Sequence, residues 1–237
     1  MTLAYTALRE KECIVTAKIW WMIHKDLTSE CRARRAWPAM LLLGIVVALV
    51  FSVQMDLLPD QRRRIVGGLL WLAVVFSGVL ALDRSLSMER EEGCGEGLLL
   101  YPVSATAIFL AKLAVNVVAL AALELILIPL FVVLSGVPLL ACPWAMALVA
   151  VLGTLGIAAV GTPIAALAAK IPDRSNLTSL LVFPMVIPVV LAAAEATRLV
   201  AENDLGAQWW RWVQFLAAYA VVFIVSGTVL FAFAVED

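Results

Sequence analysis

DRSLSMEREEGCGEGLLLYPVSATAIFLAK, from Asp83 to Lys112, is a long charged interruption between two apolar segments of this 237-residue chain. Its first half is predicted to form a short polar helix from Ser85 to about Glu92. Three glycines then end that helix, because glycine tolerates the left-handed conformation of a helix cap. These glycines are Gly93, Gly95 and Gly97. Pro102 lies in the turn before the next helix, where a missing N–H costs nothing. Such a loop suits docking onto a soluble partner, although its charges would also suit a solvated connector.

The composition around this stretch indicates a helical integral membrane protein. Hydrophobic residues make up 64% of the chain and charged residues only 15%, and the mean hydropathy is +1.01. Charged residues supply about a quarter of an ordinary globular chain. Several runs of about 20 apolar residues are long enough to cross a bilayer as helices. No short apolar core followed by a cleavage site opens the chain, so we expect no removable signal peptide.

Six apolar segments are predicted to cross the membrane. They are Ala39 to about Met55, Ile65 to Leu82, Ala105 to about Leu134, Pro143 to Lys170, Asn176 to about Ala196, and a last segment opened by Trp209, Trp210 and Trp212. Pro184 and Pro188 are expected to bend the fifth segment, because proline removes a helical hydrogen bond. A polar loop is expected from Glu195 to Asp204.

Residues 1–36 are predicted to form an amphipathic helix that lies in the membrane interface, ahead of a six-helix domain of residues 37–237. Three lysines recur every seven residues and share one helix face. They are Lys11, Lys18 and Lys25. The apolar residues around them include the pair Trp20 and Trp21, which favours the interface over an ordinary soluble amphipathic helix.

The distribution of basic residues predicts the orientation. Twelve Lys and Arg residues fall before the first span or beside the second and fourth connections, and five fall on the opposite side. The positive-inside rule therefore places both termini and the loop of residues 83–104 in the cytoplasm. It places the loops near Arg63, Leu139 and Asn203 in the periplasm, although the run from Arg62 to Arg64 argues mildly against this.

A polar pair within the third span is a candidate intramembrane site. Glu124 lies twelve residues beyond Lys112, about 18 Å along a helix, so it is expected near the middle of the membrane. Ionisable residues at such depth are often functional. The alternative is a neutral packing residue, hydrogen-bonded to Asn116 or to a threonine of a neighbouring helix. A stripe at four-residue spacing in the fourth span is interpreted as a packing face. Its members are Thr154, Ala158, Thr162 and Ala166.

Several kinds of chemistry are excluded by what the sequence lacks. The four cysteines are scattered, and His24 is the only histidine, so no protein-held metal site is expected. A nucleotide-binding GxxxxGK[ST] motif, a Ser/His/Asp triad and the aspartate-rich motif of membrane phosphoalcohol transferases are also missing. Cys142–Pro143 is a dipeptide of a kind that can bind haem, but an isolated cysteine is more often inert.

The order of these segments resembles the haem exporter protein B (CcmB) family over nearly the whole chain. The matching pieces are KDLTSECRARRAWPAMLLL (Lys25–Leu43), EREEGCGEGLLLYPVSATAIFLAK (Glu89–Lys112), LELILIPLF (Leu123–Phe131), GTLGIAAVGT (Gly153–Thr162) and the terminal VED. The central loop is the most specific of these pieces. Tyr101, where a small residue is expected, and the tryptophans that open the sixth span depart from the family pattern.

The resemblance implies an all-α ABC-2 (type V exporter-like) permease fold with six transmembrane helices and an N-terminal interface helix, in the bacterial inner membrane. It implies partners: an ATP-binding CcmA-like subunit, a CcmC-like haem-handling membrane protein, a small CcmD-like peptide and a periplasmic haem chaperone. A homodimer within the complex is also implied, and no nucleic acid. On this view the chain is not itself an enzyme and binds no cofactor. ATP is bound by the partner, and haem is handled by the complex.

The resemblance also implies that the charged loop couples the chain to the ATPase. The coupling residues would be Arg84, Glu89, Arg90, Glu91, Glu92, Gly93 and Gly97. Alternative functions are an exporter permease for lipid, glycan or drug, a non-transporting assembly subunit, and a membrane enzyme. Neighbouring genes for an ATPase and for haem-handling proteins would separate these alternatives.

Overall fold

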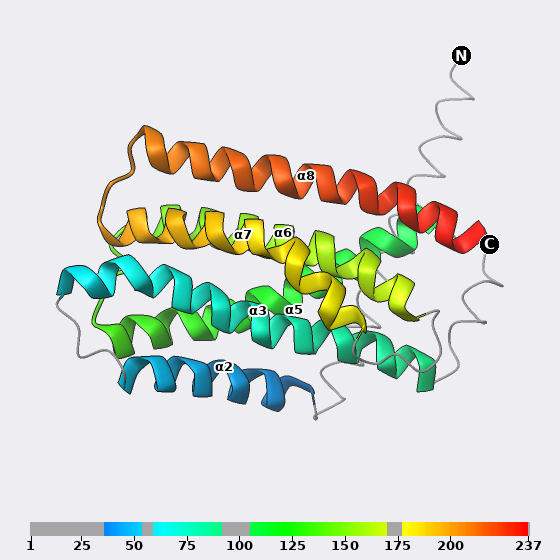
Figure 1. Ribbon diagram of the computed structural model, residues 1–237, viewed down its shortest axis with the longest axis horizontal. Coiled ribbons are helices and arrows are strands. Elements are labelled where there is room, and N and C mark those ends of the chain that lie inside the picture. Colours follow the sequence, from blue (N-terminus) through cyan, green and yellow to red (C-terminus); the bar gives the residue numbers. More distant parts are fainter. Residues whose placement is uncertain (1–35, 54–58, 92–104, 170–176, 237) are drawn as a thin grey trace, which may run out of the picture.

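The computed structural model describes residues 36–53, 59–91, 105–169 and 177–236, with side chains over 41–50, 60–79, 106–165 and 181–230. This part of the chain forms six helices joined in two places by short described turns, residues 136–142 and 202–206. The helices are α2 (Ala36–Val53), α3 (Pro59–Glu91), α5 (Ala105–Ser135), α6 (Pro143–Ala169), α7 (Leu177–Ala201) and α8 (Ala207–Glu236) (Figure 1). The all-helical prediction is therefore confirmed over the described residues.

Four of these helices are long and apolar enough to cross a membrane, judged over the described residues. Their apolar parts are Thr106–Ser135 in α5, Pro143–Ala165 in α6, Leu181–Ala201 in α7 and Ala207–Leu230 in α8. In α2 the apolar stretch that qualifies is shorter, Leu41–Val50. The helices pack side by side as a bundle (Figure 1). Crossing of the membrane by α2 and α3 stays a prediction from the sequence.

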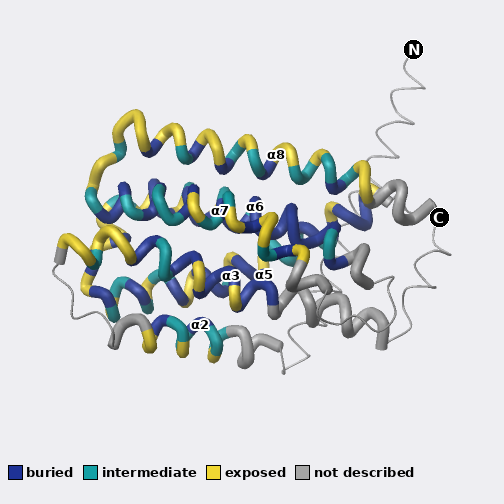
Figure 2. Tube along the Cα trace, in the orientation of Figure 1, coloured by how far each residue is buried: buried dark blue, intermediate teal, exposed yellow. Residues whose placement is uncertain are grey.

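The outer face of the bundle is apolar, as expected for a surface in contact with lipid. Leu125 is 77% exposed and Val133 is 78% exposed, both on α5. Figure 2 shows exposed positions along the outer helices and buried positions between them. Exposed apolar patches of this extent are rare on soluble monomers and mark contact with membrane or protein.

Within the core, the most extensive packing between two helices is that of α3 against α7. Gly67 lets the two backbones meet, because a Cβ atom at this position would lie 2.5 Å from the carbonyl oxygen of Ala194. One turn further, the buried indole of Trp71 covers Gly153 of α6. Its Nε1–H donates a hydrogen bond of 2.9 Å to the hydroxyl of Thr197 on α7. Three helices thus meet around one tryptophan.

The two described turns lie at the same end of the bundle. The backbone of Asn203 is left-handed, with φ 59°, and follows the last residues of α7. Asn203 N–H donates to the carbonyl of Val200 (3.1 Å) and Asp204 N–H to that of Leu199 (2.9 Å), the pattern of a Schellman cap. Across to the other turn, the thiol of Cys142 donates to the side-chain oxygen of Asn203 (3.3 Å). Figure 1 shows that α3 begins at this end too.

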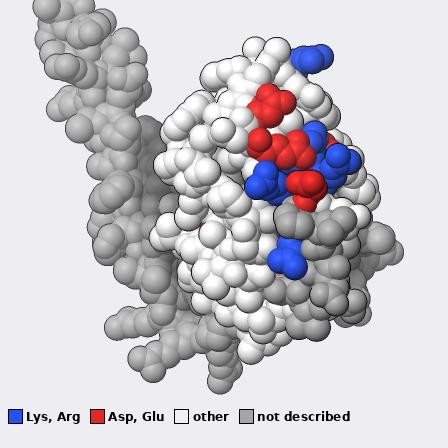
Figure 3. All heavy atoms as spheres, turned by 90° about the vertical axis from the view of Figure 1, so that its left-hand side faces the viewer, with Lys and Arg blue, Asp and Glu red and all other residues white. Residues whose placement is uncertain are grey.

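Charged side chains gather on this end of the bundle. Figure 3 looks onto it and shows Lys and Arg beside Asp and Glu, surrounded by uncharged atoms. The exposed members at the starts of α3 and α8 and in the second turn are Asp60, Arg63, Arg64, Asp204 and Arg211. The tryptophans that open α6 and α8 pack beside them: the ring centroids of Trp144 and Trp209 lie 5.5 Å apart. This combination is typical of a helix end at the headgroup level.

Two sequence-based boundaries were wrong. The span predicted to end at Leu82 and the separate helix predicted from Ser85 are one uninterrupted helix, α3, of 33 residues. No glycine or proline occurs between Val79 and Glu91, so nothing in the sequence stops the helix. At 1.5 Å per residue α3 is about 50 Å long, which exceeds the thickness of the hydrocarbon core.

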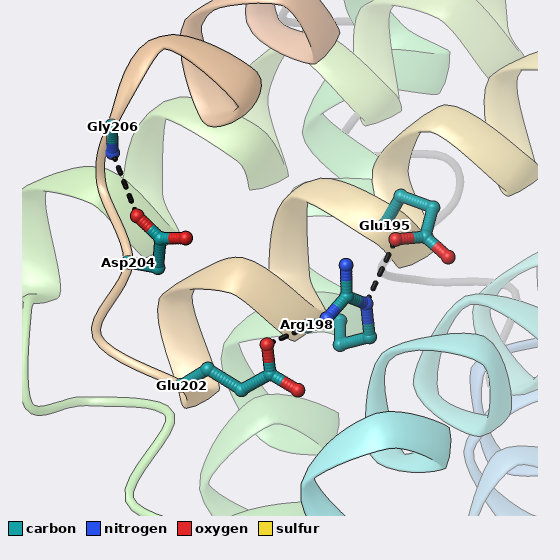
Figure 4. A network of polar contacts seen from close by, with 5 residues as sticks. All are labelled: Glu195, Arg198, Glu202, Asp204 and Gly206. Atoms are coloured by element: carbon teal, nitrogen blue, oxygen red, sulfur yellow. Dashed lines mark hydrogen bonds and ion pairs between the residues drawn. The ribbon is translucent and has the colours of Figure 1, made fainter.

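The second wrong boundary is the end of α7, predicted near Ala196 and found at Ala201. The charges that suggested a polar loop instead hold the last turns of the helix. Arg198 Nε lies 2.8 Å from a carboxylate oxygen of Glu195, and its Nη1 lies 2.5 Å from one of Glu202 (Figure 4). Opposite charges at these spacings support a helix. The helix also continues through Pro184 and Pro188, and Figure 1 shows it changing direction along its length.

Candidate functional site

Glu124 lies between α5 and α6, buried from the surface of the bundle. Its side chain is 4% exposed, and its Oε1 accepts a hydrogen bond of 2.7 Å from the hydroxyl of Thr154 on α6. A threonine of a neighbouring helix was one of the partners considered from the sequence, and it is the one that the structure shows.

Asn116 forms a second polar contact between the same two helices. Its Nδ2 donates to the hydroxyl of Thr162 over 2.9 Å, and that hydroxyl donates in turn to the carbonyl oxygen of Ala158 over 2.7 Å. Asn116 precedes Glu124 by eight residues, and Thr162 follows Thr154 by eight. The two contacts are therefore spaced equally along antiparallel helices, about 12 Å apart.

This arrangement acts chemically as a pair of cross-links rather than as an open reaction site. Every side chain in it has a partner, and the stripe of Thr154, Ala158 and Thr162 faces α5 across a closely packed interface. Small residues allow such an approach between membrane helices. Over the described residues, no group of three His, Cys, Asp or Glu side chains is placed to hold a metal ion.

Glu124→Gln tests whether the carboxyl group does more than pack. The amide oxygen of glutamine can accept the same hydrogen bond from Thr154, and the side chain keeps its shape. We therefore expect protein abundance in the membrane, measured by immunoblot, and the activity of the protein in cells to stay within about twofold of the wild type. Normal abundance with a loss of activity would show instead that the carboxyl group itself is needed.

The predicted coupling residues lie at the far end of α3 or beyond it. Arg84, Glu89, Arg90 and Glu91 belong to the last turns of this helix. Glu92, Gly93 and Gly97 lie outside the described residues, as does His24. The coupling role therefore stays a prediction. The four described coupling residues belong to the same continuous helix, α3, as Gly67 and Trp71.

Comparison of the sequence with known proteins shows the family to which this chain belongs. The profile described as CcmB protein matches residues 17–237. The chain belongs to the CcmB family. A protein named heme exporter protein B from Rhodobacter capsulatus is 26% identical over 182 residues, 77% of this chain and 83% of that protein. The protein of the same name from Paracoccus denitrificans is 27% identical over 177 residues, 75% of this chain and 81% of that protein.

A third relative, heme exporter protein B of Escherichia coli K12, is 32% identical over 68 residues, 29% of this chain and 31% of that protein. Together with the long apolar helices, membership of the CcmB family identifies the chain as a multi-pass membrane protein. It also confirms the resemblance stated from the central loop and the apolar pieces around it.

Sequence reasoning about this CcmB chain missed the contacts of Trp71 that connect α3 with α6 and α7. Trp71 was counted only as part of an apolar span, and Thr197 was assigned to a loop. Their hydrogen bond joins residues 126 positions apart, so no local pattern pairs them. The Arg198 network was also missed, although glutamates three residues before and four residues after an arginine are a readable helical signal.

Proposed function

We propose that this chain is the transmembrane permease subunit of an ABC transporter complex that handles or exports haem in cytochrome c biogenesis. The observation that carries the proposal is the match to the CcmB family over residues 17–237. The relatives that cover three quarters of the chain bear the name heme exporter protein B. The long apolar helices supply the membrane-spanning body that such a subunit needs.

In the proposed arrangement all six helices cross the bacterial inner membrane as an ABC-2 (type V exporter-like) permease. Both termini and the segment of residues 83–104 face the cytoplasm. From Ile65, its first apolar residue after the arginines, α3 continues for 27 residues to Glu91, about 40 Å. That length crosses the hydrocarbon core and leaves the charged last turns in water, where a soluble ATPase can reach them.

The proposed mechanism uses the chain for movement and its partners for chemistry. A CcmA-like subunit binds and hydrolyses ATP and displaces the cytoplasmic end of α3. The helix bundle passes this displacement to the periplasmic side, where it drives release of a haem-loaded chaperone. A CcmC-like protein holds haem, a CcmD-like peptide completes the complex, and a second copy of the chain forms a homodimer with the first.

Cysteine labelling tests the orientation. Gln208, exposed in the first turn of α8, is a suitable position, because Asn203 has a left-handed backbone and accepts a hydrogen bond from Cys142. In a background without the four native cysteines, Gln208→Cys should react with a membrane-impermeant maleimide added to spheroplasts. Asp173→Cys, in the turn predicted on the other side, should react only after lysis. Labelling of Gln208→Cys only after lysis would reverse the orientation.

Purification of the complex tests the function. Affinity capture of the full-length chain should recover an ABC-type ATPase. Deletion of the gene that encodes this chain should abolish cytochrome c maturation. The purified chain without partners, titrated with haemin, should show no saturable Soret shift that is removed by His24→Ala or Cys142→Ala. The thiol of Cys142 donates a hydrogen bond to Asn203 and lies in a turn with no second cysteine or histidine beside it among the described residues, which is a poor haem ligand set.

Two results would contradict parts of this assignment. A stoichiometric, mutation-sensitive haem spectrum of the isolated chain would mean that this chain, and not only a partner, binds haem. Normal maturation in the deletion strain, with the ATPase still captured, would favour an exporter for another substrate.

A further inference from the structure

Two contacts on one face tie α3 to α7. Gly67 and Trp71 are four residues apart and therefore share a face of α3. Their counterparts on α7, Ala194 and Thr197, are three residues apart and also share a face. At Gly67 the helices are in backbone contact, since a Cβ would lie 2.5 Å from the carbonyl oxygen of Ala194. At Trp71 they are joined by the hydrogen bond to Thr197.

The hydrogen bond is in an environment where water does not compete with it. Trp71 is 1% exposed and Thr197 is fully buried, so neither group can turn to water. A buried indole N–H that loses its partner pays the full cost of desolvation. The absence of a side chain at Gly67 lets the two helices lie close together, and the directional bond at Trp71 limits how far they can separate, slide or rotate. Together the two contacts fix the register of α3 against α7.

The same indole reaches a third helix. A Cβ at Gly153 of α6 would lie 2.1 Å from Cη2 of Trp71, so the ring occupies the space that this glycine leaves. The side chain of Trp71 on α3 therefore contacts both α6 and α7. Thr197 adjoins Arg198, whose ion pairs hold the last turns of α7 up to the cap at Asn203.

We propose that the Trp71–Thr197 contact is the joint through which α3 transmits movement from its charged end to α7 and α6. The proposal rests on the proposed function, because it takes the end of α3 as the segment that the ATPase displaces. Trp71 precedes Glu91 by 20 residues, so the joint lies about 30 Å from the last residue of the helix. Trp71 and Thr197 are positioning residues: they touch no substrate and act by holding one helix to another.

Trp71→Phe and Thr197→Val test the joint by removing one half of the hydrogen bond each while keeping most of the packing. The full complex should be purified with each variant. The measurements are ATP hydrolysis, cytochrome c maturation and the thermal stability of the complex. We expect ATP hydrolysis and assembly to persist, and maturation per ATP hydrolysed to fall about fivefold, within the range seen for substitutions along coupling networks.

Two controls separate transmission from general packing. Thr197→Ser keeps the hydroxyl and should restore the wild-type ratio of maturation to hydrolysis. Trp210→Phe makes the same ring change at a tryptophan that is 47% exposed and should leave that ratio unchanged.

The proposal would be overturned by a wild-type ratio in Trp71→Phe and Thr197→Val. It would also be overturned if both variants failed to assemble, because the contact would then serve assembly and not transmission. Failure of the proposed function looks different: the wild-type chain would then capture no ATPase, or its deletion would leave maturation intact.

Discussion

Gly67→Ala is expected to destabilise the folded chain by about 2–3 kcal/mol, at the upper end of the usual cost of overpacking. The added methyl group would lie 2.5 Å from the carbonyl oxygen of Ala194, which belongs to the backbone of α7 and cannot rotate away. The helices would have to move apart, which would also stretch the hydrogen bond from Trp71 to Thr197. The loss of stability can be measured by heating the protein in detergent and determining, by size-exclusion chromatography, the fraction that stays folded at each temperature.

The neighbouring glycine supplies a matched control. A Cβ at Gly68 would meet nothing within 4 Å, so Gly68→Ala adds the same methyl group without a clash. Alanine is favoured over glycine inside a helix by about 1 kcal/mol, so this variant should be as stable as the wild type or slightly more stable. Equal melting of the two variants would mean that α3 and α7 do not meet in the way described.

The second large effect is expected from reversing two charges at the end of α3. With Glu89→Lys and Glu91→Lys together, the folded protein should still reach the membrane, because both residues lie beyond the apolar part of the helix. On the proposed function these two glutamates contact basic residues of the ATPase partner, and such contacts would become repulsive. Like charges brought together across an interface cost several kcal/mol, so cytochrome c maturation and coupled ATP hydrolysis should fall by about tenfold or more.

Arg211→Glu is the charge-reversal control for this double variant. Arg211 is exposed at the start of α8, at the opposite end of the bundle, and an acidic residue is well tolerated near a helix N-terminus. It should leave coupling unchanged. If the Glu89 and Glu91 variant assembles with the ATPase and matures cytochrome at the normal rate, the charged end of α3 is a connector and not a docking element.

The presence of the helices could be read from the sequence because a bilayer leaves a long apolar segment little choice. Without water to satisfy its backbone, such a segment forms a helix, and Pro143 and the residues after Pro102 mark where two helices begin. The ends of α3 and α7 were misplaced because charge was taken as a sign of a loop. A helix that emerges from the membrane carries charges without ending, as Arg198 shows.

The partners of buried polar groups could be predicted only in kind. For the reading of Glu124 as a packing residue, the sequence offered Asn116 or a threonine as its hydrogen-bond partner. Only the register between α5 and α6 assigns Thr154 to Glu124 and leaves Asn116 to Thr162. The Trp71–Thr197 bond was beyond reach for the same reason, since it depends on how α3 and α7 pack and not on any local pattern.

The equal spacing of the two α5–α6 contacts has a consequence for biogenesis. Placing Glu124 and Asn116 alone in lipid would expose polar groups that hydrocarbon cannot solvate. The turn of residues 136–142 is short enough for α6 to follow α5 closely out of the ribosome. If the two helices enter the bilayer as one hairpin, Glu124 and Asn116 are already hydrogen-bonded to Thr154 and Thr162 and are not exposed to lipid. We therefore expect the translocon to release α5 and α6 together, with polar atoms already matched before the other helices join them.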